Sequence, residues 1–342
     1  MTNTAKLAIV GAGIMGRKHV AKVRSSRCAV VDCVVDPADA ARDFAASQGV
    51  PIFFDLESLF ADHRPDGVIV ANPNHLHVSS TLACLDFGIP VLVEKPVSDS
   101  VASARGLLEA IEHSGVPVLV GHHRRHHRAA REAKRVLEAG VLGRVLLAQC
   151  STWIYKGDDY FEIPWHSEPG AGPVLINLVH DVDLLRFLCG EIVFVEALAS
   201  NIARGLAVED SAVALIEFAS GALGTLSVSD AIPSPWSWEL SAAENPIYPS
   251  AGQSYLHIGA AQGALTLPNL VTWRYRDKKS WWEPLMSEQE FAPPDDPLMR
   301  QLEHFCDVIA GNVPPAVSVA DALETLKVVE AIQASANRRR RR

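Results

Sequence analysis

The sequence predicts a doubly wound α/β domain followed by an α+β domain built on an open, mainly antiparallel sheet. Up to about residue 121, short β-branched runs alternate with helix-length stretches, as in parallel βαβ units. A glycine-rich turn directly follows the first of these runs. From residue 192 onward, strands follow one another without helices between them, and tight turns make such neighbours antiparallel.

The strands of the first domain are short, uniformly apolar runs, as strands covered on both faces must be. They are expected at residues 7–10, 30–35, 68–71, 91–93 and 116–120. Pro37 opens a helix that Gly49 closes, and Asp55 caps a shorter one. Longer helices are expected at 76–87 and 101–113.

The second domain begins with helices and then changes to strands. The helices are expected at about 126–139 and 174–188. The strands are expected at 145–153, 192–200, 208–218 and 223–229. The proline-rich stretch 231–253 is expected to form a long loop, and such loops are usually functional.

Two late helices, at 297–310 and 318–335, are expected to pack back toward the first domain. We therefore predict one domain at residues 1–122 and a second at 123–336. The terminal arginine run repels itself, so residues 337–342 are expected to be unstructured.

Composition excludes several classes of protein. The chain has 31 Lys and Arg against 40 Asp and Glu, a net charge of −9 that disfavours nucleic-acid binding. The six cysteines show no Cys-x-x-Cys pair, which indicates free thiols in a reducing compartment. The first apolar run is too short for a signal peptide, and no run approaches the ~20 apolar residues of a membrane helix. We expect a cytoplasmic protein without a membrane partner.

The glycine-rich turn has the spacing of a dinucleotide site. Gly11, Gly13 and Gly16, with Ile14 and Met15 between the last two, form G-x-G-x-x-G between a strand and a helix. Such glycines let a diphosphate approach the helix terminus.

Asp36 ends the next strand, where a carboxylate accepts hydrogen bonds from ribose hydroxyls and repels a 2′-phosphate. NAD is therefore favoured over NADP. The alternative interpretation is that Asp36 only caps the helix that begins at Pro37.

Further motifs follow the strands of the first domain. They are Asn72-Pro73-Asn74-His75-Leu76-His77, Glu94-Lys95-Pro96, and Gly121 with Arg124. Together with the glycine turn they resemble the Gfo/Idh/MocA family of oxidoreductases, over nearly the whole chain. The resemblance implies an NAD-binding Rossmann domain. The cofactor-binding residues expected there are Gly11, Gly13, Ile14, Met15, Gly16, Asp36, Asn72, Asn74, His77, Glu94 and Lys95.

The resemblance also implies catalytic residues. Lys95 matches the family lysine that contacts the reacting hydroxyl or carbonyl, where an ammonium stabilises a developing alkoxide. Residues 170–183 are similar to the family's glycine-rich entry to a helix, and His180 there matches the histidine proposed as general acid or base. Asn177 lies one turn before His180. Many relatives place aspartate four residues before this histidine, where this chain has Ile176. The alternative interpretations are a surface lysine and a buried core histidine.

The run His122-His123-Arg124-Arg125-His126-His127 contains histidines at metal-ligand spacing, but its two arginines repel a divalent cation. No metal is expected. Arg124 is expected to bind a carboxylate or hydroxyl of the substrate, and His123 to contact it. A solvated basic turn is the alternative for Arg125 and His127.

Aromatic side chains lie between the strand at 145–153 and the helix of His180. Trp153, Tyr155 and Trp165 are candidates to bind a sugar face, and Lys156 to hold an anionic group. Packing at a domain junction is the equal alternative for this cluster.

These features predict an NAD-dependent dehydrogenase or reductase acting on CH–OH groups of a sugar, cyclitol or related polyhydroxy compound. The substrate class comes from the family resemblance. The alternatives are a glycosidase or lyase in which NAD oxidises the sugar transiently, and a non-catalytic NAD or sugar sensor. The open sheet predicts a homodimer or homotetramer.

Overall fold

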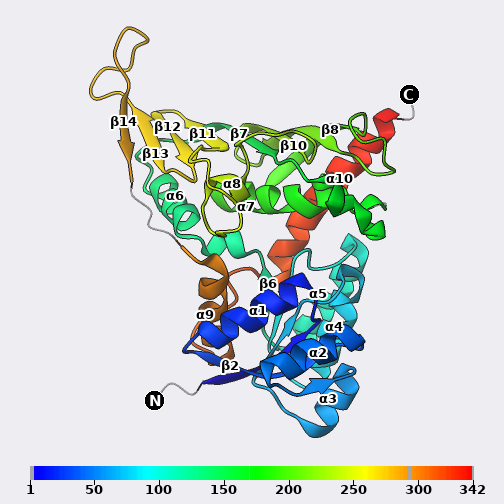
Figure 1. Ribbon diagram of the computed structural model, residues 1–342. Helices are drawn as coiled ribbons and strands as arrows, with labels where there is room; N and C mark the ends of the chain where they lie inside the picture. The colour runs from blue at the N-terminus through cyan, green and yellow to red at the C-terminus, as the bar shows by residue number, and fades with distance from the viewer. Residues whose placement is uncertain (1–3, 169, 291–294, 341–342) are drawn as a thin grey trace. The chain divides into compact units, whose positions relative to one another are not determined.

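A computed structural model describes residues 4–168, 170–290 and 295–340 of the chain. The chain forms two compact units, coloured along the sequence in Figure 1. The first consists of the residues up to His123 together with Pro297–Leu326. The second consists of Arg124–Asp296 together with the chain from Lys327 onward. Each unit therefore contains a late segment of the sequence.

The described part of the first unit contains a six-stranded sheet in the order β3-β2-β1-β4-β5-β6, and all neighbouring strands are parallel. The strands are β1 (Ala5–Val10), β2 (Ala29–Val35), β3 (Ile52–Phe53), β4 (Gly67–Val70), β5 (Val91–Glu94) and β6 (Val118–Gly121). The order reverses between β1 and β4, and ligands of doubly wound sheets bind at the carboxyl ends of strands at such a point. This confirms the predicted fold class of the first domain.

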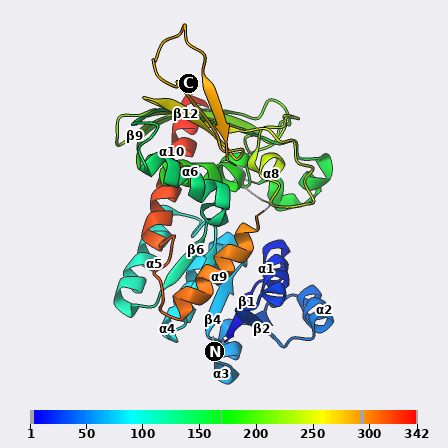
Figure 2. The ribbon, with the colours of Figure 1, turned by 90° about the vertical axis from the view of Figure 1, so that its left-hand side faces the viewer.

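Helices cover the two faces of this sheet, as Figure 2 shows. They are α1 (Ile14–Ser25), α2 (Asp39–Gln48), α3 (Leu56–Asp62), α4 (His77–Asp86), α5 (Val101–Ser114) and α9 (Pro297–Ile309). The late helix α9 packs against α1, and α4 packs against α5. Val120 at the end of β6 donates its N–H to Val317 O over 2.9 Å, which ties the late segment to the sheet.

The second unit, in its described part, contains an eight-stranded sheet in the order β14-β13-β12-β11-β7-β10-β9-β8. The strands are β7 (Val145–Trp153), β8 (Ile192–Ser200), β9 (Ser211–Phe218), β10 (Leu223–Ser229), β11 (Leu256–Ala260), β12 (Gly263–Leu267), β13 (Val271–Arg274) and β14 (Met286–Gln289). Only β7 and β10 pair in parallel among these strands. The sheet is mainly antiparallel, as predicted.

One face of this sheet packs on helices and the other is open. The covering helices are α6 (Arg128–Glu138), α7 (Val179–Cys189), α8 (Trp238–Ser241) and the later part of α10 (Val319–Arg340). Along β9, Ala214 and Ile216 are buried in the core, whereas Val213 and Leu215 are more than half exposed. Since successive strand residues point to opposite faces, the exposed set defines a largely apolar outer face.

Three short elements differ from the sequence prediction: β3 and α8 were not predicted, and α2 begins at Asp39 instead of Pro37. Two longer segments differ as well. Strands β11 to β14 lie in a stretch for which no strands were predicted. The end of the chain is the second difference, because α10 continues to Arg340 instead of ending before residue 337. Arginine has a high helix propensity and its charge is favourable at a helix C-terminus, so residues 337–340 extend the helix. Residues 341–342 of the predicted tail lie outside the described residues.

None of the helices in the described part of the chain combines the length and apolarity of a membrane span.

Candidate functional site

The glycine turn between β1 and α1 forms a surface without side chains. Gly11 has a φ of +94°, and a Cβ there would lie 2.7 Å from Ala71 O. A Cβ on Gly16 would lie 1.8 Å from Gly11 O. A Cβ added to Gly13 would have no atom of the described residues within 4 Å. Packing therefore requires glycine at positions 11 and 16. At Gly13 the turn leaves room for a diphosphate beside the positive end of α1.

A cavity of about 670 Å³ lies beside this turn, and Gly11, Asp36 and Asn72 line it. Asp36 accepts hydrogen bonds from Ala12 N at 2.7 Å and from Ala38 N at 2.9 Å, one on each carboxylate oxygen. These bonds fix the carboxylate, and each oxygen keeps a lone pair for a ribose hydroxyl. The helix-capping interpretation does not hold, because α2 begins at Asp39 with Ala38 as its N-cap and no side chain caps it.

Two further observations show that a dinucleotide fits the cavity. Asp55 and Glu57 line it together with Asp36, so its wall carries acid groups that repel a 2′-phosphate. Asn72 donates its Nδ2–H to Ser80 Oγ over 2.8 Å, and among the described residues its buried Oδ1 has no hydrogen-bond partner. That oxygen is an acceptor available to a ligand. Asn74 starts a 3-10 turn at the same end of β4, and Ile14 is largely exposed beside the glycines.

His77 is held by the main chain of two turns. The ring is fully buried, with Nδ1 at 2.8 Å from Pro96 O and Nε2 at 2.9 Å from Asn72 O. Burial lowers its pKa, and the two backbone contacts partly oppose that effect. These contacts give His77 a structural role, and its predicted contact with the cofactor stays a prediction. The ring ties two turns of the sheet together.

The turn Glu94-Lys95-Pro96 follows β5. Glu94 is buried and accepts a hydrogen bond from His19 Nε2 over 2.7 Å, and its other oxygen accepts from Lys95 N at 3.2 Å. Burial by itself raises the pKa of Glu94, but His19, with the charges of His123 and Lys95, lowers it to about 2. Glu94 is therefore a carboxylate at neutral pH. Lys95 is only half-buried, which leaves its side chain accessible at the carboxyl end of the sheet.

In the second unit, a π-helical turn (Val174–Leu178) leads into α7. Such turns often occur at functional sites. Asn177 lies in this turn, and among the described residues its buried Oδ1 has no hydrogen-bond partner. His180 lies in the first turn of α7 and is 8% exposed. Asn177 and His180 therefore lie on one continuous helical segment, and the amide oxygen of Asn177 is available to a ligand.

Arg124 is held by acidic groups of its own unit. Its side chain is 2% exposed and donates to Asp181 at 2.6 Å and to Glu239 at 2.9 Å. Asp181 also accepts from Thr152 Oγ1 at 2.7 Å and from Tyr255 Oη at 2.9 Å. These contacts give Arg124 a structural role, and its predicted contact with substrate stays a prediction.

Arg125 is also bound to an acid. It makes a bidentate pair with Asp183, at 2.8 and 2.7 Å, so it is not part of a solvated basic turn. The histidine run forms a 3-10 turn (His123–His126) instead of an α-helix, and His127 caps α6 by accepting from Ala129 N. The α-helical spacing that would pair these histidines is therefore absent from this described segment.

Trp153 lies on the face of the sheet opposite to α7. Thr152 faces α7, where it binds Asp181, so the next residue points to the other face. There the Trp153 Nε1–H donates to Ser227 Oγ over 3.0 Å. The substrate contact expected for Trp153 stays a prediction. Tyr155 and Trp165 are both about half exposed and stay candidates for a substrate contact.

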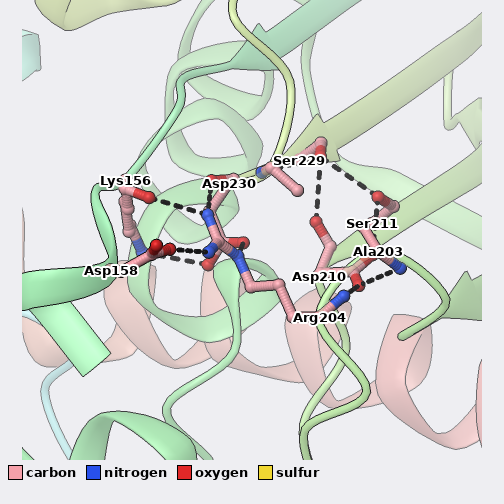
Figure 3. A network of polar contacts seen from close by, with 9 residues as sticks. Lys156, Asp158, Ala203, Arg204, Asp210, Ser211, Ser229 and Asp230 are labelled. Carbon is pink, nitrogen blue, oxygen red and sulfur yellow. Dashed lines mark hydrogen bonds and ion pairs between the residues drawn. The ribbon is translucent and has the colours of Figure 1, made fainter. Parts of the chain in front are cut away.

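The loop after β7 is held by a cluster of ion pairs around Arg204 (Figure 3). Arg204 donates to Lys156 O at 2.7 Å, to Asp230 O at 2.6 Å and to Asp230 Oδ1 at 3.2 Å. The Lys156 ammonium lies 3.5 Å from Asp230 Oδ2, and burial lowers its pKa. Lys156 is thus committed to Asp230, and the predicted anion-holding role is replaced by a structural one.

Sequence reasoning missed Asp181 and His19. Asp181 lies in an apolar helix, which is a signal for a buried ion pair, but nothing in the sequence names Arg124 as its partner. His19 shares the buried stripe of α1 with Gly16 and Val20, and that spacing was a visible signal.

Comparisons with known proteins agree with this geometry. A family model described as "Oxidoreductase family, NAD-binding Rossmann fold" matches residues 5–122, and a "GFO/IDH/MocA C-terminal domain" model matches residues 130–244. The rhizopine catabolism protein MocA of Rhizobium meliloti is 24% identical over 95% of this chain and 93% of its own length. An inositol 2-dehydrogenase of Rhodococcus jostii is 30% identical over 64% of this chain, and the match spans 60% of that relative.

A solved structure shows the same fold over the whole chain. It is an oxidoreductase from Agrobacterium radiobacter in complex with NAD+, L-tartaric acid and magnesium. Its TM-score is 0.83 at 19% sequence identity, covering 98% of this chain and 97% of that chain.

The fold and the dinucleotide site define an NAD-binding oxidoreductase with a Rossmann domain. Because the two family models together match most of the sequence, the chain belongs to the Gfo/Idh/MocA family. The resemblance noted from its motifs is thereby confirmed.

Replacing Asp36 by Asn tests the cofactor site. The amide removes the charge expected to bind two ribose hydroxyls, and its NH2 group faces one of the two backbone N–H groups that now donate to the carboxylate, so NADH affinity should fall by ~10-fold or more. NADPH should bind the variant better than it binds the parent, because a 2′-phosphate is no longer repelled. Fluorescence titration with both reduced cofactors measures this. A parent protein that binds NADPH as tightly as NADH would contradict the role given to Asp36.

Proposed function

We propose that the protein transfers a hydride between NAD and a secondary alcohol or ketone carbon of a sugar, cyclitol or related polyhydroxy compound. The observation that carries this proposal is the Glu94-Lys95-Pro96 turn, which presents an accessible lysine at the carboxyl end of β5 in the unit that holds the dinucleotide cavity. Relatives named inositol 2-dehydrogenase and 1,5-anhydro-D-fructose reductase support the substrate class.

Each reacting group in this proposal has a distinct task. The glycine turn and Asp36 hold the dinucleotide, which when bound exchanges hydride with the substrate carbon. The Lys95 ammonium stabilises the negative charge that develops on the substrate oxygen. His180 accepts the proton of the hydroxyl in oxidation and returns it in reduction.

The surroundings of His180 differ from an aspartate-assisted histidine. The residue four positions earlier is Ile176, and the adjacent Asp181 is committed to Arg124, Thr152 and Tyr255. We therefore assign the proton to His180 alone. Asn177, one turn before it, offers an amide to orient a substrate hydroxyl.

A screen of polyols and sugars with NAD, beginning with myo-inositol, tests the function. A substrate should produce a net rise in reduced-cofactor absorbance that is proportional to product. Turnover without net reduction would instead indicate transient oxidation, as in an NAD-dependent glycosidase or lyase. Binding of NAD and sugars without any turnover would indicate a sensor.

Alanine variants test the two catalytic assignments. Lys95→Ala should lower kcat by ~10²–10³-fold, which is typical for the loss of one oxyanion-stabilising donor. His180→Ala should lower it by ~10²–10⁴-fold, with partial recovery at high pH where hydroxide replaces the base. His180→Ala touches neither the glycine turn nor any residue expected to bind the cofactor, so its NADH affinity should stay nearly constant. Full turnover by His180→Ala would identify that histidine as a core residue and move the search for the base to Lys95 or His123.

We also propose that two copies of the chain associate through the outer face of the eight-stranded sheet. Val213 and Leu215 are 52% and 56% exposed on that face, and Leu198 is 50% exposed on the neighbouring strand. A hollow of about 490 Å³ lies among these side chains. A contiguous apolar surface of this kind is typical of an interface between chains.

Charge on this face should separate the copies. The double variant Val213→Glu and Leu215→Glu places four carboxylates in each two-fold interface, and burying them unpaired is costly. Light scattering coupled to size-exclusion chromatography should show the parent as a dimer or tetramer and the variant as a single chain. Glu217→Gln, an exposed position on the same strand, is the matched control. A monomeric parent would overturn the proposal.

A further inference from the structure

Two buried histidines contact the Glu94-Lys95-Pro96 turn from different helices of the first unit. His19 on α1 binds the side chain of Glu94, and His77 on α4 contacts the carbonyl of Pro96. Their rings are 2% and 0% exposed, so neither is suited to contact a substrate. Lys95 lies between the two residues that these rings contact.

The bond between His19 and Glu94 is short and charge-assisted. His19 Nε2 lies 2.7 Å from Glu94 Oε1, and Glu94 is ionised at neutral pH because its pKa is lowered to about 2. In a buried setting such a bond is stronger than in water, and its loss would leave a carboxylate without its partner. Glu94 therefore has one strongly favoured orientation.

That orientation is transmitted to the main chain of Lys95. The second oxygen of Glu94 accepts from Lys95 N at 3.2 Å. On the other side, Gly121 packs so closely that a Cβ there would lie 3.2 Å from Glu94 Cδ. The carboxylate is thus confined between His19 and β6, and it holds the first peptide of the turn in place.

The far end of the turn has an independent contact. His77 reaches Pro96 O at 2.8 Å and Asn72 O at 2.9 Å, which links the turns after β5 and β4. Loss of the His19 bond would therefore loosen the turn at Lys95 while Pro96 stays held. The expected disturbance is local.

We propose that His19 is a positioning residue which, through Glu94, fixes the backbone of Lys95 so that its ammonium meets the substrate oxygen. The proposal rests on the role given to Lys95 under the proposed function. A displacement of about 1 Å at a reacting group can cost ~10²-fold in rate, which is the scale of effect expected here.

The first test uses no substrate. His19→Gln keeps an N–H at the position of Nε2, whereas the His19→Asn amide stops one bond short. Hydrogen exchange measured by mass spectrometry on a peptide spanning residues 91–98, in which Lys95 lies beyond the first two residues, should be at least ~10-fold faster at Lys95 in His19→Asn, and near the parental rate in His19→Gln. Val23→Ala, which removes buried methyl groups from the same helix, should leave this peptide unchanged.

If His19→Asn does not fold, Glu94→Gln, which removes the charge from the other end of the same bond, replaces it and should also speed exchange at Lys95. Unchanged exchange in the folded variant, or equal acceleration by Val23→Ala, would overturn the proposal.

The second test measures kcat with myo-inositol, or with the best polyol of the screen, in a double-variant cycle. His19→Asn should lower kcat by ~10²-fold while NADH affinity stays within about threefold, and His19→Gln should restore most of the rate. In a Lys95→Met background, His19→Asn should cost almost nothing further, because the group that it positions is gone.

The outcomes of the cycle separate the two proposals. If Lys95→Met retains full turnover, the role of Lys95 falls, and with it the positioning role of His19. If Lys95→Met is slow but His19→Asn turns over normally, only the positioning role falls. The positioning role also falls if His19→Asn lowers kcat by the same factor in the Lys95→Met background, since His19 would then act by another route.

Discussion

The second unit depends on the buried carboxylate of Asp181. This one group binds Arg124 from the turn before α6, Thr152 from β7 and Tyr255 from the segment before β11. Burial raises the pKa of Asp181, and Arg124 opposes that effect. Removing one partner of such a pair typically costs about 3–5 kcal/mol, because the remaining charge stays buried. The helix that carries His180 is thereby fixed to the sheet by its neighbouring residue.

The elements that the sequence predicted well are those whose local pattern determines their structure. Residues 7–10 of β1, all of β4 and residues 91–93 of β5 are buried on both faces, so each is a continuous apolar run. Strands β8 and β10 matched their predicted bounds because β-branched and apolar residues are frequent in both and glycine-containing turns precede them. Strands β13 and β14 have four residues each and little burial, so they carry almost no pattern. Only pairing with neighbours makes them strands.

The same rule holds for the candidate site: local motifs were predicted, and contacts between distant residues were not. The glycine turn and the Glu94-Lys95-Pro96 motif are local, and the sequence indicated both. Contacts between distant residues were not visible: Arg124 and Asp181 are 57 positions apart, and His19 and Glu94 are 75 apart. A charged residue in a sequence shows that it needs a partner without showing which one. The acids of the same unit that bind Arg124 and Lys156 were consequently not predicted.

Helix α10 has a consequence for how the protein is made. Its first residues belong to the first unit, and its later residues, Val329 and Ile332 among them, complete the core of the second. Ser335 Oγ also accepts from Ala197 N at 2.9 Å on β8. Domains generally fold as units during synthesis, the earlier one first. Here neither core is complete until α10 has left the ribosome, so until then two unfinished apolar surfaces of the nascent chain are exposed to aggregation.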